Sequence, residues 1–267
     1  MIGEDPFDLQ GQVALVTGAG QGVGRGIALA LAHHNAGGIA VNDFVLERAE
    51  TVAAEIRELG VPAVAVQADV GDRDSVAAAF AAAKHGLGPV TILVNNAGNA
   101  GPNVQMGHAP LFWESDPKEW DRYFRTNTMG VLNCCHVALP DMVEARRGRI
   151  VTITSDAGRV GDARLAVYAA AKAAGGGFVR SLAREAGRFG ITCNAISLSS
   201  IAPPVDEAQL AEMMAKESVK QQLSRYAIRR YGKPDDVALM ALLLCAPASS
   251  WITGQTYPVN GGYSFAQ

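Results

Sequence analysis

The sequence has little of what several classes of protein require. Only 6% of its 267 residues are aromatic, and lysine plus arginine number 23 against 26 for aspartate plus glutamate, for a net charge of -3. With neither a basic surface nor a supply of stacking side chains, nucleic acid is not expected as a partner. Apolar runs all fall short of the ~20 residues that cross a bilayer, so a membrane partner is not expected either.

Cysteine is also scarce. The four cysteines form no C-x-x-C pair, and two of them are direct neighbours, Cys134 and Cys135. This pattern predicts buried, reduced thiols in a cytoplasmic protein rather than a disulfide framework. The first twelve residues, MIGEDPFDLQGQ, lack the basic-then-apolar pattern of a secretion signal, which favours the same location. The five histidines show no zinc-ligand spacing, so no metal site is expected.

The sequence does contain a regular alternation of short β-branched runs with alanine-rich runs. The β-branched runs are continuously apolar, as in strands that are covered on both faces by helices. This alternation predicts a doubly wound parallel α/β sheet of the Rossmann-like type, in a single domain over residues 1–267. Strands are expected at 13–18, 39–43, 61–70, 90–98, 148–155, 191–197 and 256–262.

Two stretches interrupt the alternation, residues 99–114 and about 198–225. Both follow the carboxyl end of an expected strand, where ligands bind in open α/β sheets. We therefore expect them to be pocket walls, the second as a substrate-loop insertion. Capping residues followed by proline predict a helix start at 115–117 and another at 232–236.

The glycine-rich stretch TGAGQGVG, residues 17–24, lies between the first expected strand and helix. It follows a TGxxxGxG spacing through Gly18, Gly22 and Gly24, with Gln21 and Val23 in the same turn. Without a Cβ atom, the backbone can approach a pyrophosphate at the free N–H groups of the helix start. The stretch predicts a dinucleotide-binding loop.

The second expected strand ends at Asp43, 19 residues beyond Gly24. A carboxylate there can accept hydrogen bonds from an adenosine ribose and repels a 2′-phosphate. The next residue, Phe44, is not basic, so NAD is the expected cofactor. Two alternatives stay open: Asp43 only caps a loop, or Arg25 or Arg48 reaches the phosphate of NADP.

The stretch VYAAAKAAGGGF, residues 167–178, places Tyr168 and Lys172 four residues apart on one helix face. Its three consecutive glycines cost about 1 kcal/mol each relative to alanine in a helix. We expect Gly175 to Gly177 to let this helix lie close against the sheet, the cofactor or a partner subunit.

Together these motifs resemble the short-chain dehydrogenase/reductases. The resemblance runs from about Leu9 to Tyr263 and includes TGAGQGVG, Asp69-Val70, the run 95–98, and the set Asn127, Ser155, Tyr168 and Lys172. It is greatest with the oxoacyl-carrier-protein reductase and hydroxyacyl-CoA dehydrogenase group. The run SDAGRVG, residues 155–161, is similar to alicyclic hydroxyacyl-CoA dehydrogenases.

The resemblance implies a role for each catalytic residue. Tyr168 would be the general acid/base, with a pKa lowered by ~2–3 units from its usual ~10 by an adjacent ammonium and an oxidised nicotinamide. Lys172 would supply that ammonium and bind the nicotinamide ribose. Ser155 would hold the substrate oxygen, and Asn127 would anchor a water that connects Lys172 to solvent.

The resemblance also implies further cofactor contacts. Asp69 and Val70 would flank the adenine. Asn96, Ala97 and Gly98 would support the cofactor and the sheet. The backbone of Ile201 would contact the carboxamide.

The sequence departs from the family after the sixth strand. Leu198-Ser199 stand where the family has Pro-Gly, and Pro203 stands where it has threonine. We expect a repositioned loop and a weaker hold on the cofactor.

The expected pocket walls are apolar, which suits a bulky secondary alcohol or ketone. Arg159 is expected at the rim, either meeting a phosphate or carboxylate or solvated. The apolar wall residues are Val104, Met106, Leu111, Phe112, Trp113, Val160, Leu165, Ile201, Met213 and Met214.

These observations predict an NAD(H)-dependent oxidoreductase that interconverts a secondary alcohol and a ketone, with hydroxyacyl-CoA thioesters and alicyclic alcohols as candidate substrates. An NADPH-dependent 3-oxoacyl-carrier-protein reductase is the alternative enzyme, and a dinucleotide-sensing binding protein is the alternative of another class. The four-residue spacing of Tyr168 and Lys172 argues against an enoyl reductase. The resemblance implies a homodimer or homotetramer formed through the helix around 167–178 and a helix at about 117–145.

Overall fold

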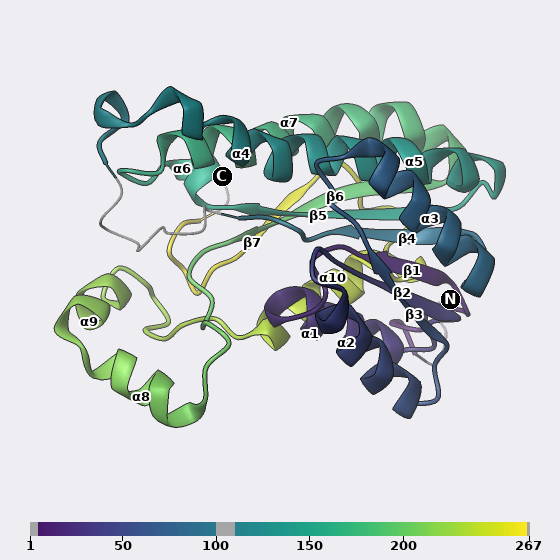
Figure 1. Cartoon of the computed structure of the whole chain (residues 1–267), viewed down its shortest axis with the longest axis horizontal. Helices are drawn as coiled ribbons and strands as arrows, with labels where there is room; N and C mark the ends of the chain where they lie inside the picture. Colours follow the sequence, from purple (N-terminus) through teal and green to yellow (C-terminus); the bar gives the residue numbers. More distant parts are fainter. Residues whose placement is uncertain (1–4, 100–109, 266–267) are drawn as a thin grey trace.

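The chain forms a seven-stranded, fully parallel sheet in the order β3-β2-β1-β4-β5-β6-β7. This computed structural model describes residues 5–99 and 110–265. The predicted Rossmann-like α/β fold is confirmed, and Figure 1 shows the sheet between two layers of helices. The strands are β1 (Val13–Val16), β2 (Gly38–Asp43), β3 (Ala63–Gln67), β4 (Val90–Asn95), β5 (Gly148–Ser155), β6 (Ile191–Leu198) and β7 (Thr256–Val259).

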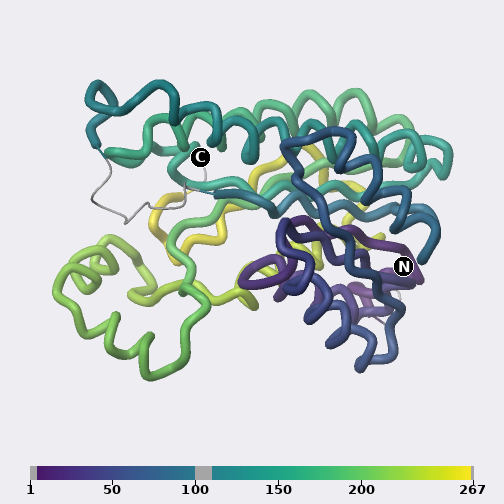
Figure 2. The backbone as a smooth tube through the Cα atoms, in the orientation of Figure 1, coloured from purple at the N-terminus to yellow at the C-terminus, as the bar shows by residue number. Residues whose placement is uncertain are grey.

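Three helices cover each face of the sheet. On one face lie α1 (Gly22–Ala32), α2 (Leu46–Glu58) and α10 (Pro234–Cys245). On the other lie α3 (Arg73–Leu87), α5 (Gly130–Glu144) and α7 (Ala166–Ala186) (Figures 1 and 2). Each layer buries its own apolar cluster against the sheet.

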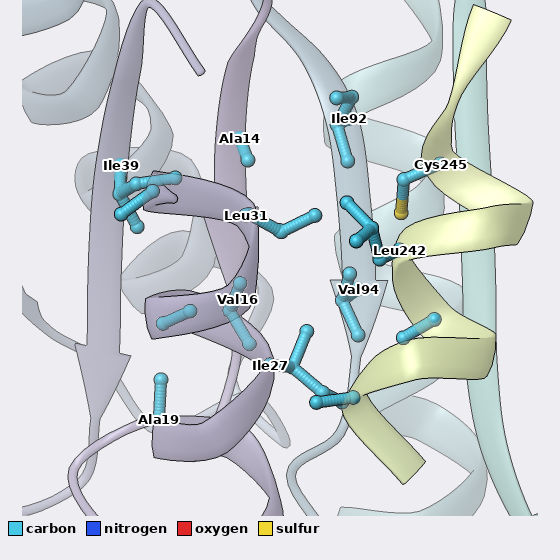
Figure 3. Packing of buried hydrophobic residues seen from close by; sticks show 14 of the residues in the cluster. Ala14, Val16, Ala19, Ile27, Leu31, Ile39, Ile92, Val94, Leu242 and Cys245 are labelled. Atoms are coloured by element: carbon cyan, nitrogen blue, oxygen red, sulfur yellow. The ribbon is translucent and has the colours of Figure 1, made fainter. Parts of the chain in front are cut away.

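The packing of α1 and α10 against the middle strands is seen in Figure 3. Ile27 and Leu31 of α1 and Leu242 of α10 lie over the side chains of β1 and β4, and all three are almost fully buried. The free, buried Cys245 packs among them, as predicted for a reduced thiol; the three other cysteines are also free and buried. The alanines of these helices bring helix and sheet close together, which fixes the start of α1 at the end of β1.

The predicted helix at about 117–145 is interrupted. Asp116 caps Pro117 as expected, but Pro117–Glu119 is only a 3-10 turn. Then follow α4 (Asp121–Phe124), a π-helical turn (Arg125–Met129) and α5. Such wide turns occur mostly at functional sites, and this one contains Asn127.

The insertion after β6 forms two helices, α8 (Glu207–Ala215) and α9 (Glu217–Leu223), which project away from the sheet (Figures 1 and 2). Across the described ranges, each helix is too short or too polar to traverse a bilayer. The remaining short elements are α6 (Ala157–Val160) and the 3-10 turns Phe112–Glu114, Gly187–Phe189 and Pro247–Ser249.

Candidate active site

The glycine loop sits between β1 and α1, where the strand order reverses. Gly18 and Gly22 have positive φ angles of 61° and 54°, which glycine adopts without strain. A Cβ on Gly24 would lie 2.3 Å from the Gly18 carbonyl oxygen and 2.5 Å from Asn96 Nδ2. The backbone is therefore packed so tightly that only glycine fits at position 24. Val23 lies in the same first turn of α1, and Gln21 is its N-cap residue.

Asn96 braces this loop from β4. Its Nδ2 donates to the carbonyl oxygens of Thr17 and Gly18, both at 3.0 Å. The Thr17 hydroxyl accepts from the N–H groups of Asn96 and Ala97, also at 3.0 Å. Sequence reasoning did not assign Thr17 a role, although its place at the strand end, directly before Gly18, was a usable signal.

Asp43 ends β2 beside the same loop. Its carboxylate is 7% exposed and accepts from the N–H groups of Gly20 and Val45, each at 3.0 Å. A Cβ on Gly20 would lie 2.7 Å from Asp43 Oδ2 and 2.5 Å from the Cβ of Arg48. Gly20 is thus required by its two neighbours, a constraint that sequence reasoning missed. Asp43 both caps the loop and faces a cavity.

That cavity has a volume of about 490 Å³. It brings together most of the predicted cofactor-binding residues. Phe44 is 68% exposed at its edge. Arg48 is also exposed in it, and its guanidinium makes no hydrogen bond or ion pair within the described ranges, whereas Arg25 pairs with Glu55 and does not line the cavity. The predicted residues that line it are Gly18, Gln21, Asp43, Phe44, Asp69, Val70, Asn96, Ala97 and Gly98.

Hydrogen bonds hold Asp69 and Val70 in the wall of this cavity. Asp69 accepts from the N–H of Gly71 and from Arg125 Nη2, both at 2.8 Å. Val70 is buried, and its carbonyl accepts from Asn133 Nδ2 at 2.9 Å. Arg125, which sequence reasoning did not single out, is thus the cation nearest Asp69.

The proposed catalytic residues meet at the end of β5 and on α7. Ser155 is the last residue of β5, and Tyr168 and Lys172 lie on the first turns of α7. Lys172 is 7% exposed, and its Nζ donates to the Ile153 carbonyl at 3.1 Å. A Cβ on Gly98 would lie 2.7 Å from this Nζ and 2.9 Å from Asn127 Oδ1. Lys172 and Asn127 therefore converge on Gly98, at the inner end of the cofactor cavity.

Asn127 holds the chain that follows Gly98. Its Nδ2 donates to the carbonyls of Asn99 and Tyr123 at 2.8 and 2.9 Å, and its Oδ1 accepts from the Asn99 N–H at 3.2 Å. The wide turn around Asn127 places this buried amide between the two segments. The role of water anchor stays a prediction.

Burial dominates the titration of the two residues on α7. It lowers the pKa of Lys172 from 10.5 to about 8, because the charged form loses its hydration. It raises the pKa of Tyr168, with a hydrogen bond to Ser155 acting in the opposite direction. In the protein by itself, desolvation of the phenolate thus outweighs the hydrogen bond from Ser155. The lowering expected beside an oxidised nicotinamide stays a prediction.

The loop that lacks Pro-Gly is held by a tyrosine. The Tyr226 hydroxyl donates to Ser200 Oγ at 2.9 Å, accepts from the Ser200 N–H at 3.2 Å, and also contacts the Ser199 hydroxyl. Ile201 pairs with Gly232 and lines a separate cavity of about 350 Å³. The predicted contact of the Ile201 backbone with the carboxamide stays a prediction.

A third cavity, of about 620 Å³, extends from Ser155 and Lys172 along α7 to Arg180. The predicted wall residue Val160 lines it and is 54% exposed. Arg159, expected at the rim, also lines this cavity, and its guanidinium donates to Asp156 Oδ1 and Ser264 Oγ.

The other predicted wall residues are spread out. Phe112 stacks on Trp120 at 5.2 Å, and Trp113 is exposed. Leu111 precedes that turn, Leu165 precedes α7, and Met213 and Met214 lie on the projecting α8. Val104 and Met106 lie outside the described residues.

The three glycines of α7 make no close approach to other described residues of the chain. A Cβ on Gly175 would lie 3.5 Å from Thr154, and on Gly176 or Gly177 it would meet only the side chain of Arg180, at 3.6 and 3.9 Å. Alanine would fit at all three positions. The tight contact with α7 is instead at Gly158 of α6, whose Cβ would lie 2.8 Å from the Ala173 nitrogen.

The cradle around Gly18 and Gly24, with Asp43 on its wall, fits a dinucleotide. In the parts of the chain that are described, histidine, cysteine, aspartate and glutamate form no group of three that would bind a metal ion.

A family model described as "Enoyl-(Acyl carrier protein) reductase" matches residues 18–264. The chain belongs to the short-chain dehydrogenase/reductase family. Members of this family are oxidoreductases that use nicotinamide dinucleotides.

Relatives of known name agree with this assignment. A 3-oxoacyl-(acyl-carrier-protein) reductase of Staphylococcus aureus is 38% identical over 250 residues, which cover 93% of this chain and 96% of the relative. The 7alpha-hydroxysteroid dehydrogenase of Escherichia coli is 33% identical over 262 residues, 98% of each chain. Among solved structures, a putative short-chain alcohol dehydrogenase of Sinorhizobium meliloti has a TM-score of 0.87 at 34% identity, covering 97% of this chain and 98% of the other. A 7 alpha-hydroxysteroid dehydrogenase complexed with NADH and 7-oxo glycochenodeoxycholic acid also has a TM-score of 0.87, at 33% identity over 98% of each chain.

Proposed function

We propose that this oxidoreductase interconverts a secondary alcohol and a ketone, with NAD(H) as the preferred dinucleotide. The observation that supports this best is the hydrogen bond between Ser155 and Tyr168, with Lys172 one helical turn further along α7. The Lys172 ammonium lies against Gly98, which lines the same cavity as Gly18 and Asp43. The bound nicotinamide would supply the hydride chemistry.

The chain's own groups would move the proton. The Tyr168 phenol would exchange a proton with the substrate oxygen, and the Ser155 hydroxyl would donate a hydrogen bond to that oxygen as negative charge develops on it. The buried Lys172 ammonium would stabilise the Tyr168 phenolate. Because the protein alone raises the pKa of Tyr168, we expect alcohol oxidation to be fastest on the alkaline side of neutrality.

The preference for NAD(H) rests on Asp43. Its buried carboxylate faces the cavity at the end of β2, and a 2′-phosphate there would meet a like charge. The relative crystallised with NADH is consistent with this. The alternative is an NADPH-dependent 3-oxoacyl-carrier-protein reductase. It is favoured by the unpaired Arg48 in the same cavity and by the named Staphylococcus relative.

We further propose a bulky, apolar substrate, of the hydroxyacyl-CoA or alicyclic class, and a homodimer or homotetramer in the cytoplasm. The bulky, apolar substrate is supported by Val160, which is exposed in the cavity that Ser155 also lines. The oligomer is supported by the open surface of α7 at Gly177, because the described part of the chain gives no packing reason for a glycine there.

The test is Tyr168→Phe, which removes one hydroxyl. We expect turnover of secondary alcohols to fall by at least about 100-fold while dinucleotide affinity, measured by fluorescence titration, changes little. Tyr257→Phe, on β7, is the control and should keep wild-type turnover. Unchanged turnover in Tyr168→Phe would refute the mechanism. Dinucleotide binding without turnover on a panel of CoA thioesters and cyclic alcohols would instead favour a dinucleotide-sensing binding protein.

A further inference from the structure

The residue after Ser155 is a buried carboxylate at the centre of a dense hydrogen-bond network. Asp156 is 1% exposed. Its Oδ1 accepts from Ser197 Oγ at 2.7 Å and from Arg159 Nη1 at 2.9 Å. Its Oδ2 accepts from Ser264 Oγ at 2.9 Å and from Asn260 Nδ2 at 2.5 Å. The carboxylate is thus shared by four donors from three separate parts of the chain.

Those donors connect Asp156 to three segments near the end of β5. Ser197 belongs to β6, one residue before Leu198, whose carbonyl accepts from the Asp156 N–H at 2.8 Å. Arg159 belongs to α6. Asn260 and Ser264 belong to a tight turn after β7, in which Gly261 and Gly262 have positive φ angles and the Gly262 N–H donates to Asn260 Oδ1.

The same segment fixes Ser155. The Ser155 Oγ accepts from the Ala157 N–H at 3.2 Å, so its orientation depends on the main chain of residues 155–157. The side chain and N–H of Asp156, in the middle of this segment, are both held from outside it. A buried carboxylate that keeps four donors satisfied resists displacement, because any shift leaves polar groups unpaired.

We propose that Asp156 is a positioning residue that holds the Ser155 hydroxyl against Tyr168 by anchoring the segment 155–157 to β6, α6 and the 260–264 turn. This inference rests on the proposed function, since Ser155 is the residue that would hold the substrate oxygen. It also makes the 260–264 turn part of the structure that supports the active site.

The inference predicts an effect on Tyr168 as well as on rate. The hydrogen bond of Ser155 lowers the pKa of Tyr168. If Asp156 no longer holds Ser155, the phenol loses this bond and its pKa rises further. The midpoint of the kcat–pH profile for alcohol oxidation should therefore move to higher pH.

Asp162 offers a matched control, because it also holds the turn after β7. Asp162 accepts a hydrogen bond from the Tyr263 hydroxyl, and its Oδ1 lies 3.7 Å from Arg225 Nη2. It lies six residues after Asp156 in the sequence and is not adjacent to Ser155. Asp156→Asn and Asp162→Asn should both speed amide hydrogen exchange of residues 260–264. Only Asp156→Asn should lower kcat, by about 10- to 100-fold with KM changed little, and raise the pH midpoint.

Two results would overturn the inference: a folded Asp156→Asn with wild-type kcat and pH midpoint, or an equal loss of kcat in Asp162→Asn. If Asp156→Asn does not fold, Ser197→Ala and Ser264→Ala each remove one donor and should raise the midpoint with a smaller loss of kcat; an unchanged midpoint in both would refute the inference. A wild-type protein that turns over no secondary alcohol would refute the proposed function, and the inference with it. An active wild type with unaffected variants would refute the inference alone.

Discussion

At the scale of single residues, burial decides the chemistry of this site. Lys172 is the clearest case, because a buried ammonium is a cost to folding that only function explains. Its folded-state pKa of about 8 lies below the ordinary 10.5. Between these two values the unfolded chain binds more protons than the folded one, so stability rises with pH in this window. Below about pH 8 the folded and the unfolded chain both carry the Lys172 ammonium, so the full free-energy cost of burying this charge lowers the stability.

We therefore expect Lys172→Met to abolish turnover without loss of stability at pH 7. Removing the ammonium should relieve a cost of about 3 kcal/mol, since each pKa unit corresponds to ~1.4 kcal/mol. Denaturant unfolding at pH 7 and pH 10 measures this: the wild type should gain stability relative to Lys172→Met at the higher pH. An identical pH dependence in both proteins would contradict the assignment.

We expect dinucleotide choice to depend on two residues of the cofactor cavity, Asp43 and Arg48. Asp43→Asn removes the charge that would repel a 2′-phosphate, so we expect the ratio of kcat/KM with NADH to that with NADPH to fall by about tenfold, or 1.4 kcal/mol. Arg48→Gln should leave NADH kinetics unchanged. Arg25→Gln, outside the cavity, is the control. A wild type that prefers NADPH and loses that preference in Arg48→Gln would establish the alternative enzyme.

At the scale of elements, each loop of the site is held by a side chain from another element. Asn96, directly after β4, braces the glycine loop, and Asn127 of the wide turn holds the chain after Gly98. Tyr226, beyond α9, does the same for the loop at 199–200. The loop after β6, which we expect to be repositioned with a weaker hold on the cofactor, is thus bound to a buried phenol that is 5% exposed.

Tyr226→Phe tests this compensation. We expect dinucleotide affinity to fall several-fold, because two serine groups lose a buried partner worth about 1–3 kcal/mol. Tyr231→Phe is a neighbouring control that should bind as the wild type does. Isothermal titration of both variants with the dinucleotide gives the answer. Equal affinities would mean that the 199–200 loop is ordered without Tyr226.

At the scale of the whole molecule, one surface lacks an explanation within a single chain. Figure 1 shows α4, α5 and α7 side by side on one layer. Phe124 of α4 and Met129 of the wide turn are exposed there, at 38% and 46%. Gly177 lies on the same layer with only the Arg180 side chain near its Cβ position. Three glycines that the chain does not need for its own packing are consistent with the proposed subunit contact.

Gly177→Leu should therefore weaken assembly. A leucine fits the single chain, so we expect the variant to fold but to sediment as a smaller species than the wild type. Gly187→Leu is the matched control, since the Cβ position of Gly187 is also open but lies in the turn after α7. Analytical ultracentrifugation compares the three proteins. Identical sedimentation would exclude a contact through Gly177.

Local patterns were sufficient to predict much of this protein. Apolar runs located the strands, the glycine spacing located the loop, and the four-residue interval put Tyr168 and Lys172 on one helix face. These features depend on backbone geometry over a few residues, which the sequence by itself determines.

The tertiary structure decided what depends on distant segments. Only the assembled sheet brings Ser197, Asn260 and Ser264 to Asp156, and only packing desolvates Tyr168 and so raises its pKa. The break in the helix around Asn127 likewise follows from contacts across the fold. Burial and long-range hydrogen bonds are properties of the folded chain, so no local pattern contains them.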